Sequence, residues 1–109
     1  MRKFDTGATR DTDKDKLDYE GFLSPFVLKR YAEYLHKHRL QTDGKMRDSD
    51  NWQNGIPKNV YMKSLCRHHM EAWLQHRVIA PHSESLQESL CGVIFNAMGY
   101  LYELLEEQR

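Results

Sequence analysis

Apolar residues recur at helical spacing in three stretches of this chain, and the first stretch follows a clear helix start. Ser24 is a good N-cap, and Pro25 fits the first helical position. The three- and four-residue spacing that follows predicts a helix with one buried face, ending near Leu40. That face contains Val27, Leu28, Tyr31, Tyr34, Leu35 and His38.

The second stretch predicts a helix over about residues 59–77. Its inward stripe, placed at about 100° per residue, mixes apolar side chains with histidines. His68 and Glu71 lie on a flank of this stripe, and Arg67 faces farther away. The predicted stripe consists of Met62, Leu65, Cys66, His69, Trp73 and His76.

The third stretch is expected to open at residues 81–84, and Ser85 with Glu88 has the spacing of a helix capping box. Three stripes that each contain apolar or small residues run along this helix, so it is expected to be buried by a partner subunit as well as by its own chain. Its main apolar face is Leu86, Leu90, Val93, Ile94, Leu101 and Leu105. A second stripe is Glu84, Glu88, Cys91, Phe95 and Tyr102, and a third, of small residues, is Ser85, Ser89, Gly92 and Asn96.

The remaining segments contain no strand pattern. Residues 1–15 are polar and predict an arm that stays disordered unless a partner orders it. Residues 16–23 hold enough apolar side chains to dock on a core, and residues 41–57 form a long loop, which in a small domain is often functional. Trp52 and Ile56 are expected to pin this loop. The predicted fold is all-α: a three-helix bundle unit over residues 16–109, with oligomerisation through its helices.

Composition narrows the class of protein. The 109 residues suit one domain, and 16 basic against 16 acidic residues argue against general nucleic-acid binding. The apolar runs fall far short of the roughly 20 residues of a membrane span. The basic start of the chain is not followed by the apolar stretch of a secretory signal. Cys66 and Cys91 lack CxxC spacing, so we expect two buried free thiols and a cytoplasmic protein.

Two groups of side chains have the spacing of metal ligands. His68 and Glu71 are three residues apart on one helix, a spacing that recurs among metal ligands in helical bundles. Glu84 and Glu88 share a face of the next helix, where Mg²⁺ or Mn²⁺ would relieve their repulsion. Ordinary explanations remain open for both. His69 can be a core histidine beside solvated His68 and Glu71, and the two glutamates can complement the helix dipole.

The loop carries the third group. Lys45 and Arg47 have the charge to bind phosphate oxygens. Asn51 can hydrogen-bond the edge of a base, and Trp52 can stack on its face. Such residues are also common in surface loops, and Trp52 can serve only as a core plug. No phosphate-binding GxxxxGK[ST] pattern is present.

Several segments together resemble a phage family, the N-terminal domain of dATP/dGTP diphosphohydrolases of the MazZ type, related to MazG-type all-α NTP pyrophosphatases. The most specific are NWQNGIP and the Arg67-His68 pair. The resemblance covers most of residues 16–100 in order. The segments are residues 16–20 (KLDYE), 23–25 (LSP), 32–34 (AEY), 51–57 (NWQNGIP), 64–68 (SLCRH) and 95–96 (FN).

This resemblance implies a helical oligomer that splits a deoxynucleoside triphosphate into the monophosphate and pyrophosphate with Mg²⁺ or Mn²⁺. MazG-type enzymes carry ExxE and then ExxD patterns on facing helices. Here Glu71 has no carboxylate three or four residues before it, and Cys91 stands where an acid would complete an ExxD with Glu88. The metal site is therefore expected to be reduced, to use histidines, or to be lost.

Three hypotheses follow. In the first, Glu71, Glu84 and Glu88 hold the metal, and His68 or His69 orients or deprotonates the attacking water. Phosphates are then held by Lys45, Arg47 or Arg67, and the base by Asn51 and Trp52. In the second, the chain binds a nucleotide without turning it over. In the third, it is a helical adaptor that docks a larger protein through its last long helix.

Overall fold

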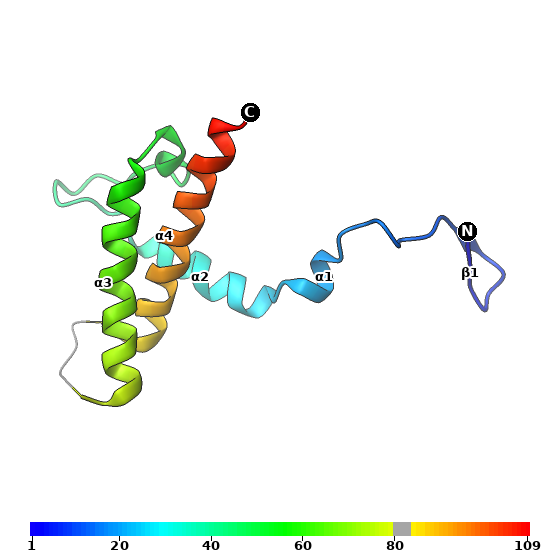
Figure 1. Ribbon diagram of the computed structural model, residues 1–109, viewed down its shortest axis with the longest axis horizontal. Helices are drawn as coiled ribbons and strands as arrows, with labels where there is room; N and C mark the ends of the chain where they lie inside the picture. Colours follow the sequence, from blue (N-terminus) through cyan, green and yellow to red (C-terminus); the bar gives the residue numbers. More distant parts are fainter. Residues whose placement is uncertain (80–83) are drawn as a thin grey trace.

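The computed structural model describes residues 1–79 and 84–109, and this part of the chain is mostly helical, as the sequence predicts (Figure 1). Two long helices lie side by side. A shorter helix crosses them and leads out into an extended N-terminal segment. The elements in chain order are β1 (Arg2–Lys3), β2 (Thr9–Arg10), α1 (Tyr19–Phe22), α2 (Pro25–Lys37), the 3₁₀ helix η1 (Asn51–Asn54), α3 (Lys58–Arg77) and α4 (Leu86–Glu107).

Helix α2 begins where the sequence predicts and ends three residues early. The Ser24 hydroxyl accepts a hydrogen bond from the Val27 amide at 3.2 Å, so one of the free N–H groups of the first turn is satisfied. At the other end, the His38 Nδ1 bonds the Tyr34 carbonyl at 2.9 Å. Leu40, which the sequence places inside the helix, instead pairs with Met46 across a short hairpin.

Helix α4 begins with the predicted capping box, formed by Ser85 and Glu88. Its stripe of small residues packs against α3, and two glycines permit the close approach. A Cβ atom at Gly99 would lie 2.2 Å from the buried Tyr61 ring, and one at Gly92 would lie 2.5 Å from His68 Nδ1. The rings of Tyr61 and His68 on α3 therefore occupy the space beside Gly99 and Gly92, where α4 has no side chain.

The predicted inward stripe of α3 is wrong in this chain. Only Leu65 of that stripe is partly buried, while its other members face outward. The hydropathy of α3 alone does not decide its orientation, because α4 offers glycine and serine for bulky or polar side chains to pack against. The side that faces the rest of the chain contains Tyr61, Ser64, Leu65, His68, Glu71, Ala72 and Gln75.

Helix α2 contributes a small core against a second side of α4, which differs both from the side that faces α3 and from the side opposite α3. Tyr31, Tyr34 and Cys91 are buried there, with Leu35, Phe95 and Met98 packed around them. Burial raises the pKa of the Tyr31 hydroxyl and that of the Cys91 thiol. Both cysteines are free, as predicted, but Cys66 is exposed rather than buried.

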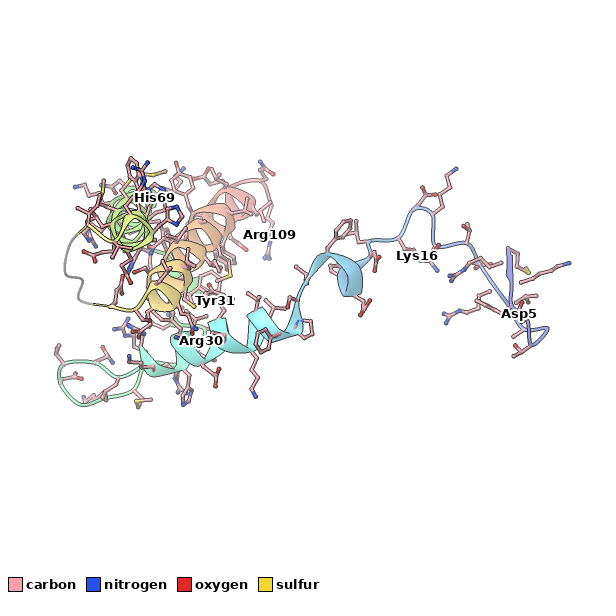
Figure 2. The ribbon with its side chains drawn as sticks, turned by 90° about the horizontal axis from the view of Figure 1, so that it is seen from below. Asp5, Lys16, Arg30, Tyr31, His69 and Arg109 are labelled. Carbon is pink, nitrogen blue, oxygen red and sulfur yellow. The ribbon has the colours of Figure 1, made fainter. Side chains whose placement is uncertain are left out.

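The N-terminal segment differs from the prediction in two ways. Residues 1–15 include a two-stranded antiparallel hairpin, in which Gly7 adopts a positive φ of 89° in the turn. Residues 16–23 do not dock on the core: Leu17 and Phe22 are 69% and 79% exposed. Figures 1 and 2 show the cause, because α2 carries this segment away from the two long helices.

None of the helices in residues 1–79 and 84–109 is long and apolar enough to cross a membrane.

Candidate functional site

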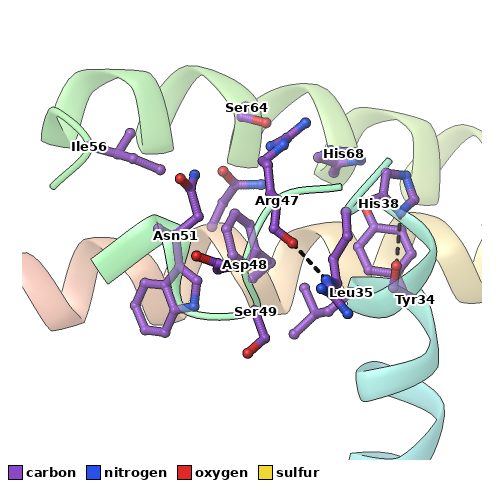
Figure 3. A pocket seen from close by; sticks show the side chains of 14 residues that line it. Tyr34, Leu35, His38, Arg47, Asp48, Ser49, Asn51, Ile56, Ser64 and His68 are labelled. Atoms are coloured by element: carbon purple, nitrogen blue, oxygen red, sulfur yellow. Dashed lines mark hydrogen bonds between the residues drawn. The ribbon is translucent and has the colours of Figure 1, made fainter. Parts of the chain in front are cut away.

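A cavity of about 280 Å³ lies between the loop that follows α2 and the helices α2, α3 and α4 (Figure 3). Every one of these elements supplies part of its wall. Four residues singled out from the sequence line it: Arg47, Asn51, Trp52 and His68. The other lining residues are Tyr34, Leu35, His38, Arg39, Asp48, Ser49, Ile56, Ser64, Phe95 and Asn96.

Backbone pairing in the loop brings two guanidinium groups to one wall. The Arg47 amide donates to the Arg39 carbonyl at 2.8 Å, and Arg39 Nε donates to the Arg47 carbonyl at 2.7 Å. Within the described residues, neither side chain forms an ion pair with a carboxylate. Asp48 is the only acid among the lining residues, so the wall is net positive and suits an anion.

The opposite end of the cavity is aromatic and amide-rich. Trp52 packs edge-on against Tyr102 and Phe95, with ring centroids 4.9 and 6.2 Å apart, so the loop is pinned as predicted. Asn51, which precedes Trp52 in the chain, lines the same cavity (Figure 3). Asn96, which is 5% exposed, donates from Nδ2 to the Gly92 carbonyl at 2.8 Å. Its amide oxygen is left to accept a further hydrogen bond.

His68 is held by a chain of hydrogen bonds between α3 and α4. Its Nδ1 donates to Glu84 Oε1 at 2.8 Å, and the same oxygen accepts from the Ser89 hydroxyl at 3.1 Å. Gln75 Nε2 in turn donates to that hydroxyl at 3.0 Å. With Glu84 ionised, the proton of the neutral imidazole stays on Nδ1, and the lone pair is on Nε2. This is the arrangement of a histidine that can accept a proton.

A second, more open hollow adjoins the first, since His68 lines both. Its other lining residues are Arg67, Met70, Glu71 and Glu84. Glu71 Oε2 is buried there without a hydrogen-bond partner among the described residues. A buried carboxylate oxygen without a partner is rare, and a cation is one explanation for it.

Glu88 lies elsewhere, with different partners. Its carboxylate accepts a hydrogen bond from Lys37 Nζ at 2.7 Å and completes the capping box with Ser85. Both contacts hold the pKa of Glu88 below its usual value, that from Lys37 being the larger. Within residues 1–79 and 84–109, no three His, Cys, Asp or Glu side chains gather closely enough to hold a metal ion. The three predicted carboxylates are therefore not brought together.

Two further predicted residues lie outside both hollows. His69 is exposed on the outer side of α3, with its ring 6.2 Å from that of Trp73. Lys45 is exposed in the hairpin turn, where its amide donates to Asp43 Oδ1. Of the two adjacent histidines, His68 therefore lines the cavity and His69 does not. Of the two loop cations, Arg47 lines it and Lys45 does not, and the sequence did not make either distinction.

The sequence also missed several residues that form the cavity. From the sequence alone, none of them has a role in a site: Tyr34 and His38 belong to an apolar helix face, and Asn96 to a stripe of small residues. Burial raises the pKa of the Tyr34 hydroxyl, with smaller contributions from Glu84, Cys91 and Glu88. One sequence signal could have pointed to these residues: polar groups that recur on an otherwise apolar helix face. Such groups are commonly buried and hydrogen-bonded.

Comparisons with protein-family models, with curated proteins and with solved structures gave no match to this chain.

Proposed function

We propose that this chain binds a deoxynucleoside triphosphate in the cavity and hydrolyses it to the monophosphate and pyrophosphate. The observation that carries the proposal is the position of His68. This side chain stands where a cavity with an aromatic ring, two amide side chains and two guanidinium groups meets a hollow with two carboxylates. The NWQNGIP and Arg67-His68 segments that resemble diphosphohydrolases supply residues to this same place.

The cavity has groups for each part of a nucleotide. Trp52 offers a surface for a base, and Asn51 and Asn96 offer amides for its edge. Arg47 and Arg39 lie within the same walls and can hold phosphate oxygens. A nucleotide bound in this way places its α-phosphate near His68, and its remaining phosphates reach toward Arg67.

The carboxylates of the second hollow suit Mg²⁺ or Mn²⁺ in a reduced site. Mg²⁺ is commonly held by one or two carboxylates, with water and substrate phosphates as its other ligands. Glu71, with its unpartnered oxygen, and the second oxygen of Glu84 are the groups that would hold it. Bound there, the ion would neutralise charge on the triphosphate.

His68 is the proton acceptor in the proposed reaction. Water attacks the α-phosphorus while His68 Nε2 takes one of its protons. The bond between that phosphorus and the oxygen leading to the β-phosphate breaks, and pyrophosphate leaves with the electron pair. Glu84 stabilises the imidazolium through Nδ1, as the carboxylate of a catalytic triad does.

The proposal also includes a specific arrangement of the helices and an oligomer. We take α2, α3 and α4 as a three-helix bundle unit that forms oligomers, in keeping with the resemblance to MazG-type enzymes. We place the protein in the cytoplasm, where its two free thiols remain reduced.

Pyrophosphate release from a panel of deoxynucleoside triphosphates, with Mg²⁺ or Mn²⁺, tests the activity. His68→Ala should lower turnover by about 10²–10⁴-fold, the usual contribution of a general base. His69→Ala is the matched variant, because the adjacent ring lies outside both hollows, and it should leave turnover unchanged. Absence of turnover with every nucleotide at high protein concentration would contradict the enzymatic proposal.

One observation favours a second function, nucleotide binding without turnover. The described residues gather no three metal-ligating side chains, and the buried Cys91 stands where an acid would complete the ExxD pattern. In that case, the bound nucleotide should be recovered intact. Glu84→Gln and Glu88→Gln should then leave its affinity nearly unchanged.

A further inference from the structure

The chain exposes more surface than a protein of its size does when fully folded alone. Its exposed area is 9122 Å², and its radius of gyration is 19.1 Å. A compact 13.0 kDa monomer exposes about 6,300 Å² and has a radius of gyration near 13 Å. Part of the excess belongs to the N-terminal segment. Even so, a stable homodimer needs only about 800 Å² from each copy.

One side of α4 is apolar and uncovered. Between Leu90 and Leu105, every exposed side chain of this helix is apolar. Helix α3 and helix α2 cover two sides of α4, and no described element lies over the side opposite α3 (Figures 1 and 2). A helix side that faces water normally carries charged residues, so this side is expected to be covered in the native assembly. The exposed residues are Leu90, Ile94, Ala97, Leu101, Leu104 and Leu105.

The spacing on this side selects a helix as the covering element. From Gln87 onward, seven exposed positions are spaced by alternating steps of three and four residues, which is the repeat of a coiled-coil seam, and the exposed Leu105 lies beside them. The seam is also the same read from either end: glutamine, two large apolar residues, alanine, two large apolar residues, glutamine. It consists of Gln87, Leu90, Ile94, Ala97, Leu101, Leu104 and Gln108.

We propose that two copies of this chain pair through the outer sides of α4, in antiparallel orientation, with the two-fold axis near Ala97. In an antiparallel two-fold pair, each position meets a position on the other side of the axis. A seam that matches its own reverse therefore brings apolar residues of one copy against apolar residues of the other. Leu90 then packs beside Leu104 of the second copy, and Ile94 beside its Leu101. The small Ala97 lets the helices approach at the axis, and their opposed dipoles favour this orientation.

This proposal specifies the surface of the oligomer that the proposed function includes, but it does not depend on nucleotide binding or turnover. Both hollows lie on the α3 and loop side of α4, so variants of the outer side leave their lining residues intact. Failure to dimerise and failure to bind nucleotide are therefore separate results.

The mass of the full chain in solution, measured by sedimentation, tests the pairing first. We expect twice the 13.0 kDa chain mass. Ile94→Glu combined with Leu101→Glu should raise the dimer dissociation constant by on the order of 100-fold or more, because it buries unpaired charges at the centre of the seam. The helical circular dichroism should stay unchanged. Met62→Glu is the matched control, a similarly exposed apolar residue on α3, and it should leave the dimer intact.

Cross-linking tests the orientation, in a Cys66→Ser background that removes the exposed native thiol. A mixture of Leu90→Cys and Leu104→Cys chains should form a disulfide between the two kinds of chain. Leu90→Cys alone should give no cross-linked dimer. Cross-linking of Leu90→Cys with itself would overturn the antiparallel arrangement. A monomeric wild-type chain, or a dimer that survives the double glutamate variant, would overturn the surface; the monomer would instead favour an adaptor that docks another protein.

Discussion

The two sides of α4 differ in chemistry and in what covers them. The side toward α3 carries Ser89, Gly92, Asn96 and Gly99, all of them buried. The outer side carries leucine and isoleucine, which are exposed in the single chain. Hydropathy alone would assign these sides the other way round. The comparison teaches that small and polar residues can form the intramolecular contact, while the large apolar residues stay exposed and are available for the proposed second copy.

The same difference separates the residues of the candidate site from those of the proposed dimer interface. The inner side, together with Glu84 just before the helix, positions His68 through Gly92 and Ser89, and it supplies Asn96 to the cavity. The outer side contributes to neither hollow. Substitutions on the inner side should therefore change stability or nucleotide binding, and those on the outer side should change the oligomer.

The largest effect on stability is expected at Gly99. The Tyr61 ring is 1% exposed and occupies the space that a side chain at Gly99 would need. Gly99→Val should therefore lower the free energy of unfolding by about 3 kcal/mol, at the upper end of overpacking effects. Leu105→Val on the outer side is the control, and it should change stability by less than about 1 kcal/mol. Urea unfolding of both variants compares the two sides, and equal losses would contradict the difference between them.

A smaller loss is expected when the hydroxyl of Ser89 is removed. Ser89→Ala breaks the link between Gln75 and Glu84 in a fully buried place. The cost should be about 1–2 kcal/mol in unfolding free energy, because Gln75 loses its acceptor. Ser64→Ala removes a hydroxyl that takes part in no such relay among the described residues, and it should cost less when both variants are compared by urea unfolding.

Gly92→Ala should separate stability from binding. The added methyl group meets the imidazole of His68, a partly exposed side chain that can turn aside, and alanine favours the helix by about 1 kcal/mol. Stability should therefore change little. The displaced imidazole should weaken nucleotide binding by about tenfold, or 1.4 kcal/mol, in calorimetric titration. Unchanged affinity together with unchanged stability would show that His68 does not contribute to the site.

The smallest effect is expected from the ion pair at the start of α4. Lys37 lowers the pKa of Glu88, so the pair stabilises the fold above the usual carboxyl pKa, near 4.5. This contribution should be lost as the pH falls through the lowered pKa of the folded state. Glu88→Gln should reduce the difference in melting temperature between pH 7 and pH 3. An unchanged difference would mean that the pair contributes nothing to the acid sensitivity.

The sequence predicted local features of the fold better than its packing. The caps at Ser24 and Ser85 depend on adjacent residues, and both were found where predicted. The inward side of α3 was wrong, because it depends on which side of α4 has glycines to receive Tyr61 and His68. The N-terminal hairpin was missed, since two-residue strands leave too short a pattern to recognise.

The candidate site shows the same division. Arg47, Asn51 and Trp52 were singled out by residue type in one loop, and the structure places all three in the cavity. The grouping of Glu88 with Glu84 at one metal site assumed that residues on one helix stripe share a partner. The contact of Glu88 with Lys37 comes from the crossing of α2, which no spacing along α4 reveals.

The fluorescence of Trp52 gives the most direct test of nucleotide binding in the cavity. Trp73→Phe removes the only other tryptophan, which is exposed on α3, and leaves Trp52 as the sole reporter. This variant is titrated with α,β-methylene deoxynucleoside triphosphates, which cannot be cleaved at the α–β linkage, in the presence of Mg²⁺. We predict a saturable change in Trp52 emission that Arg47→Ala weakens and Met62→Glu does not. No saturable change with any of the four bases, up to millimolar concentration, would contradict a nucleotide site in this cavity.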